Sequence, residues 1–302
     1  MYDAIVIGAG PAGLQAALTL GRMHRSALLL DSGEYRNGTV LHMHNMIGED
    51  GTPPAELRAR ARRELAAYDT VEVRDDAAQR IDGAEAEGFR VTLADDTVVE
   101  GRRVVLATGI ADDLPDVPGL QALWGLTAFS CPFCDGHEHA GKPIAIVGAA
   151  PRALHLIGLL GRIVDGITVV PVGAAFADED RALLEGSGAT VSSAPVDAVE
   201  AHDGGVLVHT AAEDLAVAGV FVAAASMRQR APFAADLGLR MLESGSIEID
   251  EFGRTSVPGV YAAGDLAHRA TLPGPMASVL LAAGAGQLAA VGVIQSLLAA
   301  GA

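Results

Sequence analysis

The sequence predicts an α/β protein with two doubly wound nucleotide-binding-type domains, the second inserted in the first, and with small β-hairpin elements. Three observations support this fold class. The order strand, glycine turn, helix, strand occurs twice, beginning at Tyr2 and again at Pro143. Each repeat has an alternating segment typical of a β-hairpin near it, followed by a further buried strand. With 302 residues, of which 50% are hydrophobic, the chain is long enough for two domains with their own cores.

The first repeat has the pattern of a dinucleotide-binding turn. Residues 2–7 form a predicted buried strand that runs into Gly8-Ala9-Gly10-Pro11-Ala12-Gly13 and then into an apolar helix at 14–20. The first glycine allows the bend, the second lets backbone amides approach a pyrophosphate, and the third lets the helix pack on the strand. A second strand at 27–30 ends in Asp31, where an acid is expected to hold a ribose hydroxyl. A surface turn rich in Gly and Pro does not account for these features together.

The second repeat and the hairpins complete the predicted order of elements. Pro143 to Val147 is a predicted strand, Gly148 to Ala153 is its turn, a helix begins at 154–160, and the next strand is 167–172. The remaining predicted elements are hairpins and buried strands, namely 89–93 paired with 97–100, 206–210 paired with 214–217, and the strands 104–107 and 220–223.

An uncharged stretch, Ala270 to Ala302, is long enough to suggest a membrane span. We favour a different interpretation, because the stretch is dominated by Ala and Gly and is interrupted by Pro273 and Pro275. Small residues suit a helix that packs closely inside an α/β domain. The sequence therefore predicts a buried C-terminal helix from about 276 to 298.

The only two cysteines of the chain occur as Cys131-Pro132-Phe133-Cys134. In a cytosolic protein this spacing favours a redox or metal-binding pair over a structural disulfide. We predict a redox couple, since a C-x-x-C motif at a helix start lowers a thiol pKa and keeps the partner sulfur within reach. The alternative is a zinc half-site with His137 and His139, which we disfavour because two histidines one residue apart straddle a strand poorly.

Charge and composition exclude several other classes of function. The formal net charge of −17 disfavours nucleic acid and anionic membrane as partners. The first residues lack a basic segment and begin a strand directly, so we expect a cytoplasmic protein. His42 and His44 are expected to pack or hydrogen-bond rather than to bind a metal. The charged run at 58–64 is expected to be a solvated helix face.

Taken in order, the motifs resemble those of the low-molecular-weight thioredoxin reductases over nearly the whole chain. The shared motifs are Gly8 to Gly13, Ala107-Thr108-Gly109, Cys131-Pro-Phe-Cys134-Asp-Gly136 and Thr255-Ser-Val-Pro-Gly-Val-Tyr-Ala-Ala-Gly-Asp265. The resemblance implies an FAD-binding domain at 1–114 and 246–302, and an inserted NAD(P)H-type domain at 115–245 that carries the two cysteines. It also implies a homodimer.

The same resemblance implies roles for individual residues. Cys134 is the sulfur nearer the flavin, Cys131 exchanges with the substrate, and Asp135 carries the proton. Asp265 holds the ribityl chain, and the helix start near Ala277 directs its positive end at the flavin pyrimidine. The complete set of implied cofactor-binding residues is Gly8, Gly10, Pro11, Ala12, Gly13, Asp31, Ser32, Arg36, Asn37, Asn45, Gly48, Thr108, Gly109, Gly264, Asp265 and Ala277.

Departures from the reductase pattern occur in the second nucleotide turn. Ala150 replaces the second glycine, Pro151 removes an amide, and the segment after Val172 is acidic where arginines are expected. NAD(P)H binding is therefore doubtful. Three segments are similar to those of the flavin-dependent dithiol oxidases of gliotoxin-like and holomycin-like natural products. They are Glu34-Tyr-Arg-Asn37, the segment 50–57 and the C-P-[FY]-C tetrad. Those oxidases commonly carry His after the second cysteine, where this chain has Asp135 as the reductases do.

The sequence thus predicts an FAD-dependent enzyme that oxidises a small-molecule dithiol with oxygen as acceptor. Three alternatives stay open. The first is an NAD(P)H-dependent reductase of a thioredoxin-like protein, and the second is a reductase supplied by ferredoxin or another protein donor. The third, a redox-silent binding protein, predicts a colourless protein or no effect of Cys131→Ser.

Overall fold

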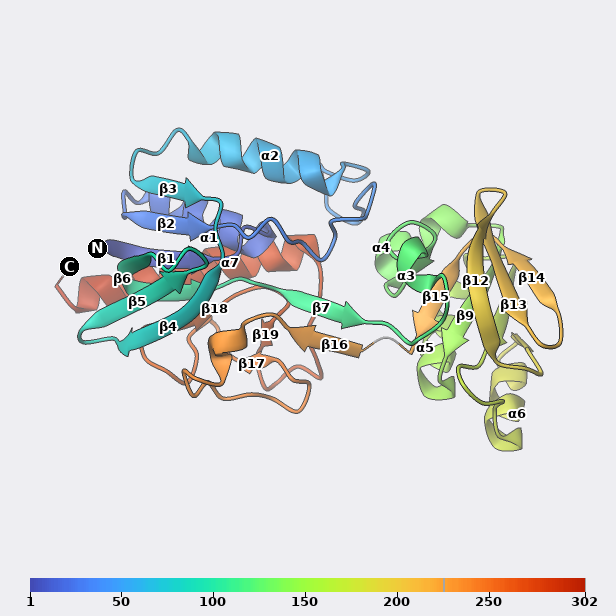
Figure 1. Ribbon diagram of the computed structural model, residues 1–302. Helices are drawn as coiled ribbons and strands as arrows, with labels where there is room; N and C mark the ends of the chain where they lie inside the picture. Colours follow the sequence, from blue (N-terminus) through green and yellow to red (C-terminus); the bar gives the residue numbers. More distant parts are fainter. Residues whose placement is uncertain (225, 302) are drawn as a thin grey trace. The chain divides into compact units, whose positions relative to one another are not determined.

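The structure is a computed structural model that describes residues 1–224 and 226–301. The chain forms two compact units (Figure 1). Unit 1 contains Met1–Gly38, Ala55–Ala111 and Met227–Ala302, and unit 2 contains Thr39–Pro54 and Asp112–Ser226. The predicted fold class is confirmed, since each unit contains a parallel sheet with a β-hairpin or meander beside it.

Unit 1 is built on a seven-stranded sheet in the order β3-β2-β1-β6-β5-β4, with β18 paired to β6. Strands β1, β2, β3, β6 and β18 are parallel, whereas β4, β5 and β6 form an antiparallel meander. The bounds are β1 (Tyr2–Ile7), β2 (Ala27–Leu30), β3 (Val71–Arg74), β4 (Ala78–Ala84), β5 (Gly88–Leu93), β6 (Val98–Leu106) and β18 (Val260–Ala262).

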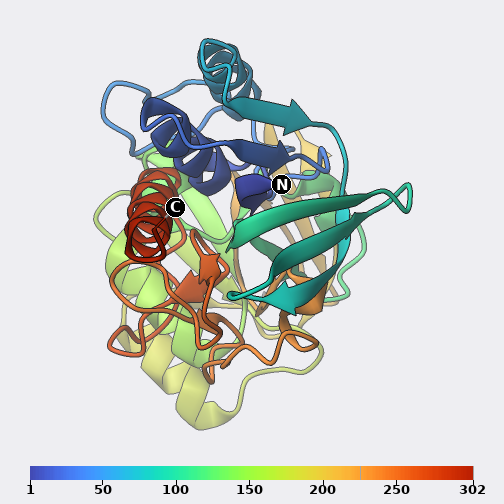
Figure 2. The same cartoon turned by 90° about the vertical axis from the view of Figure 1, so that its left-hand side faces the viewer.

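Three helices belong to this sheet, namely α1 (Pro11–Arg22), α2 (Pro54–Leu65) and α7 (Val279–Ala299). Side chains alternate along β1, so that Ala4 and Val6 pack with α1 and α7 in one core cluster while Ile5 and Ile7 belong to a second cluster. Figure 2 shows α7, in red, running beside α1, in dark blue. The two helices approach closely at Gly286, where an added Cβ would lie 2.0 Å from the backbone oxygen of Ala12.

The predicted C-terminal helix exists, but it is not buried on all sides. It begins at Val279 rather than near 276, and Leu280, Leu281 and Leu288 on its outer side are each nearly half exposed. By length and composition α7 is apolar enough to cross a membrane, with a mean hydropathy of 1.6. This is weak evidence, because helices packed within domains pass the same test, and α7 packs on α1 within unit 1.

The second face of the unit 1 sheet is covered by shorter elements. Ala231, Phe233, Ala234 and Leu239 join the core cluster of Ile5 and Ile7. These residues belong to unit 1, which resumes at Met227. These elements are η2 (Pro232–Ala234), the pair β17 (Ile247–Glu248) and β19 (Ala267–His268), and the pair β7 (Ile110–Asp113) and β16 (Ser226–Gln229).

Unit 2 contains a five-stranded parallel sheet in the order β11-β10-β9-β15-β8 and an antiparallel three-stranded sheet in the order β12-β13-β14. The strands are β8 (Ala128–Phe129), β9 (Pro143–Gly148), β10 (Gly166–Val170), β11 (Thr190–Val191), β12 (Val196–His202), β13 (Gly205–Thr210), β14 (Asp214–Val217) and β15 (Val220–Ala223). The helices are α3 (Leu120–Leu123), α4 (Pro132–Asp135), η1 (His137–His139), α5 (Ala150–Leu160) and α6 (Asp178–Gly186).

Candidate active site

The two cysteines lie at the start of α4 in unit 2. Cys131 is the N-cap residue, Pro132 is the first helical residue, and the amides of Cys134 and Asp135 both donate to the Cys131 carbonyl, at 3.3 and 3.2 Å. This single turn brings the two Cα atoms to 5.4 Å, and the sulfurs form a disulfide. The predicted redox disulfide is thus present, and both sulfurs are engaged with each other. Across residues 1–224 and 226–301, no group of three or more His, Cys, Asp or Glu residues could hold a metal ion.

Asp135 is the last residue of α4 and lies on a cavity of about 630 Å³. Burial, together with the smaller effect of the negative charge of Glu138, raises the pKa of its carboxyl to about 7, whereas His44 acts in the opposite direction. A carboxyl with this pKa exchanges protons near neutral pH, as a proton carrier for thiol chemistry must do.

His139 holds the turn that carries Asp135. It lies on a 3-10 helix, not on the strand that we assumed when weighing zinc ligation. Its Nδ1 donates to the Asp135 carbonyl oxygen at 2.8 Å, and its buried ring meets the rings of Phe129 and Phe221 edge-on. A Cβ at Gly219 would come within 2.2 Å of the His139 Nε2. The ring is therefore packed and hydrogen-bonded as part of the support of the site.

His44, which sequence reasoning treated as an ordinary packed histidine, also lines the Asp135 cavity. Its Nε2 lies 3.6 Å from Glu138 Oε1 and its Nδ1 lies 3.6 Å from Asp50 Oδ1. The amide of Asn45, a residue with a left-handed backbone (φ 62°), donates to Asp50 at 2.7 Å and lowers the pKa of that carboxyl. No periodic pattern relates residue 44 to residue 138, so only the fold could identify this pair.

The predicted cofactor-binding residues divide between the two units. Asn45 and Gly48 lie in the segment Thr39–Pro54, which clusters with unit 2, as do Cys131, Cys134 and Asp135. All the others lie in unit 1: Gly8, Gly10, Pro11, Ala12, Gly13, Asp31, Ser32, Arg36, Asn37, Thr108, Gly109, Gly264, Asp265 and Ala277.

The glycine turn of unit 1 has the geometry that a pyrophosphate site requires. Gly8 has φ 108°, and a Cβ there would lie 2.4 Å from the Ala107 oxygen, whereas a Cβ on Gly13 would lie 1.7 Å from the Gly8 oxygen. A Cβ on Gly10, by contrast, would meet no atom within 4 Å. The outer glycines thus permit the bend and the close packing of α1, and the middle one leaves the backbone accessible at the N-terminus of the helix.

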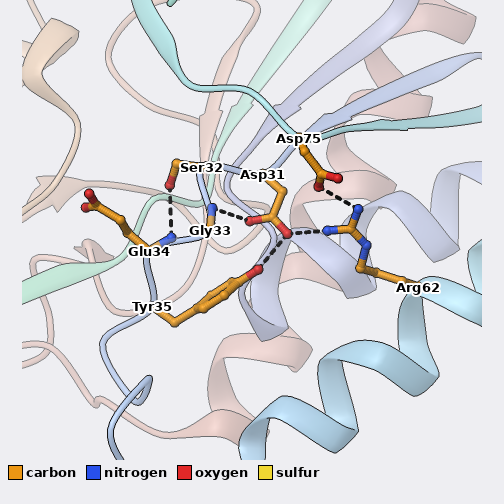
Figure 3. Close-up of polar contacts among 7 residues, drawn as sticks. All are labelled: Asp31, Ser32, Gly33, Glu34, Tyr35, Arg62 and Asp75. Carbon is orange, nitrogen blue, oxygen red and sulfur yellow. Dashed lines mark hydrogen bonds and ion pairs between the residues drawn. The ribbon is translucent and has the colours of Figure 1, made fainter.

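Asp31 follows β2 and receives three hydrogen bonds (Figure 3). Gly33 N donates to Oδ1 at 2.9 Å, while Tyr35 and Arg62 both donate to Oδ2 at 2.6 Å. Burial and the Asp31 carboxylate raise the pKa of Tyr35 to about 12. Ionised carboxylates offer about four acceptor positions, so one position is left for a ribose hydroxyl.

The charged run on α2 is not simply the solvated helix face that we expected. Arg62 also pairs with Asp75 at 2.6 Å (Figure 3). One turn earlier, Arg58 lies 3.8 Å above the Tyr35 ring and donates to the Asn37 side chain at 3.1 Å. Two arginines of α2 therefore reach back to the turn that follows β2.

Further features of unit 1 fit an FAD. The Thr108 hydroxyl is buried and has no hydrogen-bond partner within the described part of the chain. Arg36 Nη1 lies 3.4 Å from Asp265 Oδ2, and Gly264 before it has φ 88°. Ala277 lies just before α7 and packs on the core cluster of Ile5. These groups are hydrogen-bond donors and acceptors suited to a dinucleotide. They are the accessible backbone at Gly10, the buried Thr108 hydroxyl, and the Asp265 carboxylate beside Arg36.

The second nucleotide turn, in unit 2, borders a cavity of about 380 Å³. Ala150 is buried at the second-glycine position, and Pro151 stands in the first turn of α5. Asp180 is the one charged residue among the described residues that line this cavity. Arg181 points to other partners, since it donates to the carbonyls of Val191 and Ser192 at 3.2 and 3.0 Å.

Comparison with known proteins agrees with this geometry. The family model described as pyridine nucleotide-disulphide oxidoreductase matches residues 2–286. The chain is 31% identical to "Thioredoxin reductase aclD" of Aspergillus oryzae, over 98% of this chain and 96% of that protein. The structure titled "Crystal structure of HlmI" has a TM-score of 0.89 and 33% identity, covering 98% of this chain and 92% of HlmI. The putative thioredoxin reductase TrxB of Bacillus anthracis has a TM-score of 0.90 and 28% identity, covering 99% of each chain.

Proposed function

The chain belongs to the pyridine nucleotide-disulphide oxidoreductases, and we propose that within this family it acts as an FAD-dependent dithiol oxidase. It is a thioredoxin reductase-like disulfide oxidoreductase that carries a Cys131–Cys134 disulfide. The proposal concerns the direction of electron flow. Electrons enter from a small-molecule dithiol at the disulfide and leave to oxygen.

One observation carries this proposal, namely the second nucleotide turn. NADPH brings a pyrophosphate and a 2′-phosphate, and both need backbone amides or cations. Ala150 adds a methyl group where the backbone must come close to a pyrophosphate, at the position that Gly10 holds in the first turn. The Asp180 carboxylate on the cavity repels a phosphate, and Arg181 is held by backbone carbonyls. The second nucleotide turn therefore favours an enzyme that does not take its electrons from NADPH.

The chemistry at the disulfide follows from the residues of α4. A substrate thiol attacks Cys131, so a substrate–Cys131 disulfide forms, the Cys131–Cys134 bond breaks, and Cys134 leaves with the electron pair as a thiolate. The Asp135 carboxylate takes the proton of the attacking thiol. The second substrate thiol then attacks its own mixed disulfide, so Cys131 is released reduced and the substrate leaves as a disulfide. With a carboxyl pKa of about 7, Asp135 accepts and returns this proton near neutral pH.

The residues of unit 1 would hold the cofactor. Gly8, Gly10 and Gly13 would present backbone to the pyrophosphate, Asp31 would accept a ribose hydroxyl, and Asp265 would hold the ribityl chain. A bound FAD would supply the two-electron acceptor for the reduced cysteine pair and the route to oxygen, for an overall reaction of R(SH)₂ + O₂ to RS₂ + H₂O₂.

Oxygen consumption by the holoenzyme tests the proposal. With dithiothreitol as the dithiol we expect oxygen uptake with one peroxide per dithiol, no uptake in Cys131→Ser or Cys134→Ser, and little uptake with a monothiol. NADPH or NADH alone should support none. The relative aclD is named a thioredoxin reductase, which favours a second candidate, an NAD(P)H-dependent thioredoxin reductase. Reduction of thioredoxin at the expense of NADPH would establish that candidate and refute ours.

A further inference from the structure

His44 lies between two carboxylates at the edge of the Asp135 cavity. Its two ring nitrogens face opposite partners, with Nε2 3.6 Å from Glu138 and Nδ1 3.6 Å from Asp50. The His44 side chain is 23% exposed, whereas that of Asp50 is 68% exposed. The Glu138 side chain is 39% exposed, so Nε2 faces the carboxylate that lines the cavity and Nδ1 faces the more exposed carboxylate of Asp50.

Asp135 lies on the same cavity as this pair. Glu138 follows Asp135 by one helical turn, and Asp135, Glu138 and His44 line the same cavity. The charge of Glu138 raises the pKa of the Asp135 carboxyl, whereas His44 lowers it. His44 thus lies between Asp50 and Glu138, and Glu138 shares the cavity with Asp135.

We propose that His44 relays protons between Asp135 and solvent during thiol–disulfide exchange, with Asp50 and Glu138 as its flanking acceptors. The inference rests on the proposed function, in which Asp135 takes the proton of the attacking thiol. An imidazole accepts a proton at one nitrogen and releases one from the other, so the proton received by Asp135 passes by way of Glu138 and His44 to Asp50 and water. No electrons move along this route, and the electron pair stays with Cys134. The same route runs in reverse when a leaving thiolate needs a proton.

Other ionisable groups near the cavity have different partners or positions. His139 uses its Nδ1 for the Asp135 carbonyl, and Lys142 donates to the Glu138 carbonyl at 3.2 Å. His137 lowers the pKa of the Asp50 carboxyl rather than that of Asp135. The remaining ionisable residues of the lining are His42, His202 and Asp203.

The test is anaerobic stopped-flow reduction of the holoenzyme by dithiothreitol from pH 5.5 to 8.5. We expect His44→Gln to lower the rate about tenfold near pH 6.5, a loss within the range for proton-transfer groups, and to move the midpoint of the pH profile upward. Glu138→Gln should move the midpoint downward, because it removes a negative charge beside Asp135. His44→Ala should regain rate on addition of imidazole, which fits beside the open cavity. His42→Gln, a histidine of the same lining, is the matched control and should behave as wild type.

The outcomes separate the relay from the proposed function. If wild type is reduced by dithiothreitol but His44→Gln matches His42→Gln, the relay is wrong and the oxidase proposal stands. The relay also fails if imidazole restores nothing to His44→Ala, or if the His44 and Glu138 variants move the midpoint in the same direction. If wild type is not reduced by the dithiol at all, the proposed function itself fails.

Discussion

Asp135→Asn should stabilise the protein at alkaline pH while it slows the chemistry. The pKa of the Asp135 carboxyl is raised from 3.8 to about 7, with burial as the main cause. A raised acid pKa favours the protonated folded state, so its contribution to stability is fully present below about pH 3.8 and is lost as the pH rises through about 7. Because Asn cannot ionise, the variant avoids this loss.

The magnitude follows from the pKa difference. One pKa unit corresponds to 1.36 kcal/mol, so the rise from 3.8 to about 7 is worth about 4 kcal/mol for a fully desolvated group. Asp135 is only partly buried, and solvent screening reduces the expected gain to about 2 kcal/mol. We therefore expect Asp135→Asn to gain about 2 kcal/mol over wild type between pH 4 and pH 8.

Urea unfolding of both FAD-saturated proteins at pH 4 and pH 8 measures this gain. Asp203→Asn is the control, because it removes a 92% exposed carboxyl that lines the same cavity. It should give the same difference from wild type at both pH values. In the same proteins, Asp135→Asn should reduce the rate of disulfide reduction by dithiothreitol about 100-fold. A stability difference between Asp135→Asn and wild type that does not change with pH would refute the argument.

Two further predictions concern unit 1, one its helix packing and the other its FAD affinity. Gly286→Ala should lower the free energy of unfolding by more than about 2 kcal/mol, because its Cβ would lie 2.0 Å from the Ala12 oxygen. Gly284→Ala, whose Cβ would meet nothing within 4 Å, should raise the free energy of unfolding by about 0.5 to 1 kcal/mol. Thermal unfolding of both variants measures these changes, and equal effects would contradict the close packing of α7 on α1. Arg62→Gln should weaken FAD binding about tenfold, since it leaves the buried Asp31 carboxylate without its cation. The dissociation constant of FAD, measured by flavin fluorescence, gives this effect, and it should be unchanged in Arg63→Gln, a variant of the neighbouring exposed arginine. An unchanged dissociation constant in Arg62→Gln would contradict the role given to the Arg62–Asp31 pair.

Local patterns explain how much of the fold could be predicted from the sequence. The strand at Tyr2–Ile7 and the turn up to Gly13 are encoded by adjacent residues, so the required backbone geometry is visible in the sequence itself. The C-terminal helix exists and begins three residues later than predicted, but the sequence does not indicate its exposed leucines, because a helix made of Ala, Gly and Leu shows no polar face.

The candidate site was predictable only in part, for the same physical reason. The disulfide joins residues three apart, and this spacing favours a redox or metal-binding pair in the sequence itself. The contact of His44 with Glu138 and that of Arg62 with Asp31 join distant segments. Neither residue differs in the sequence from an ordinary surface side chain, so the tertiary fold alone identifies these contacts.

The central claim is that electrons enter this enzyme from a dithiol and not from a nicotinamide. The most direct test is anaerobic stopped-flow absorbance of the flavin band on mixing the holoenzyme with NADPH, with NADH and with dithiothreitol. We predict that only the dithiol bleaches the band, that oxygen restores it, and that Cys134→Ser abolishes the response. Rapid bleaching by NADPH or NADH alone would contradict the account and make the protein a pyridine-nucleotide-dependent reductase.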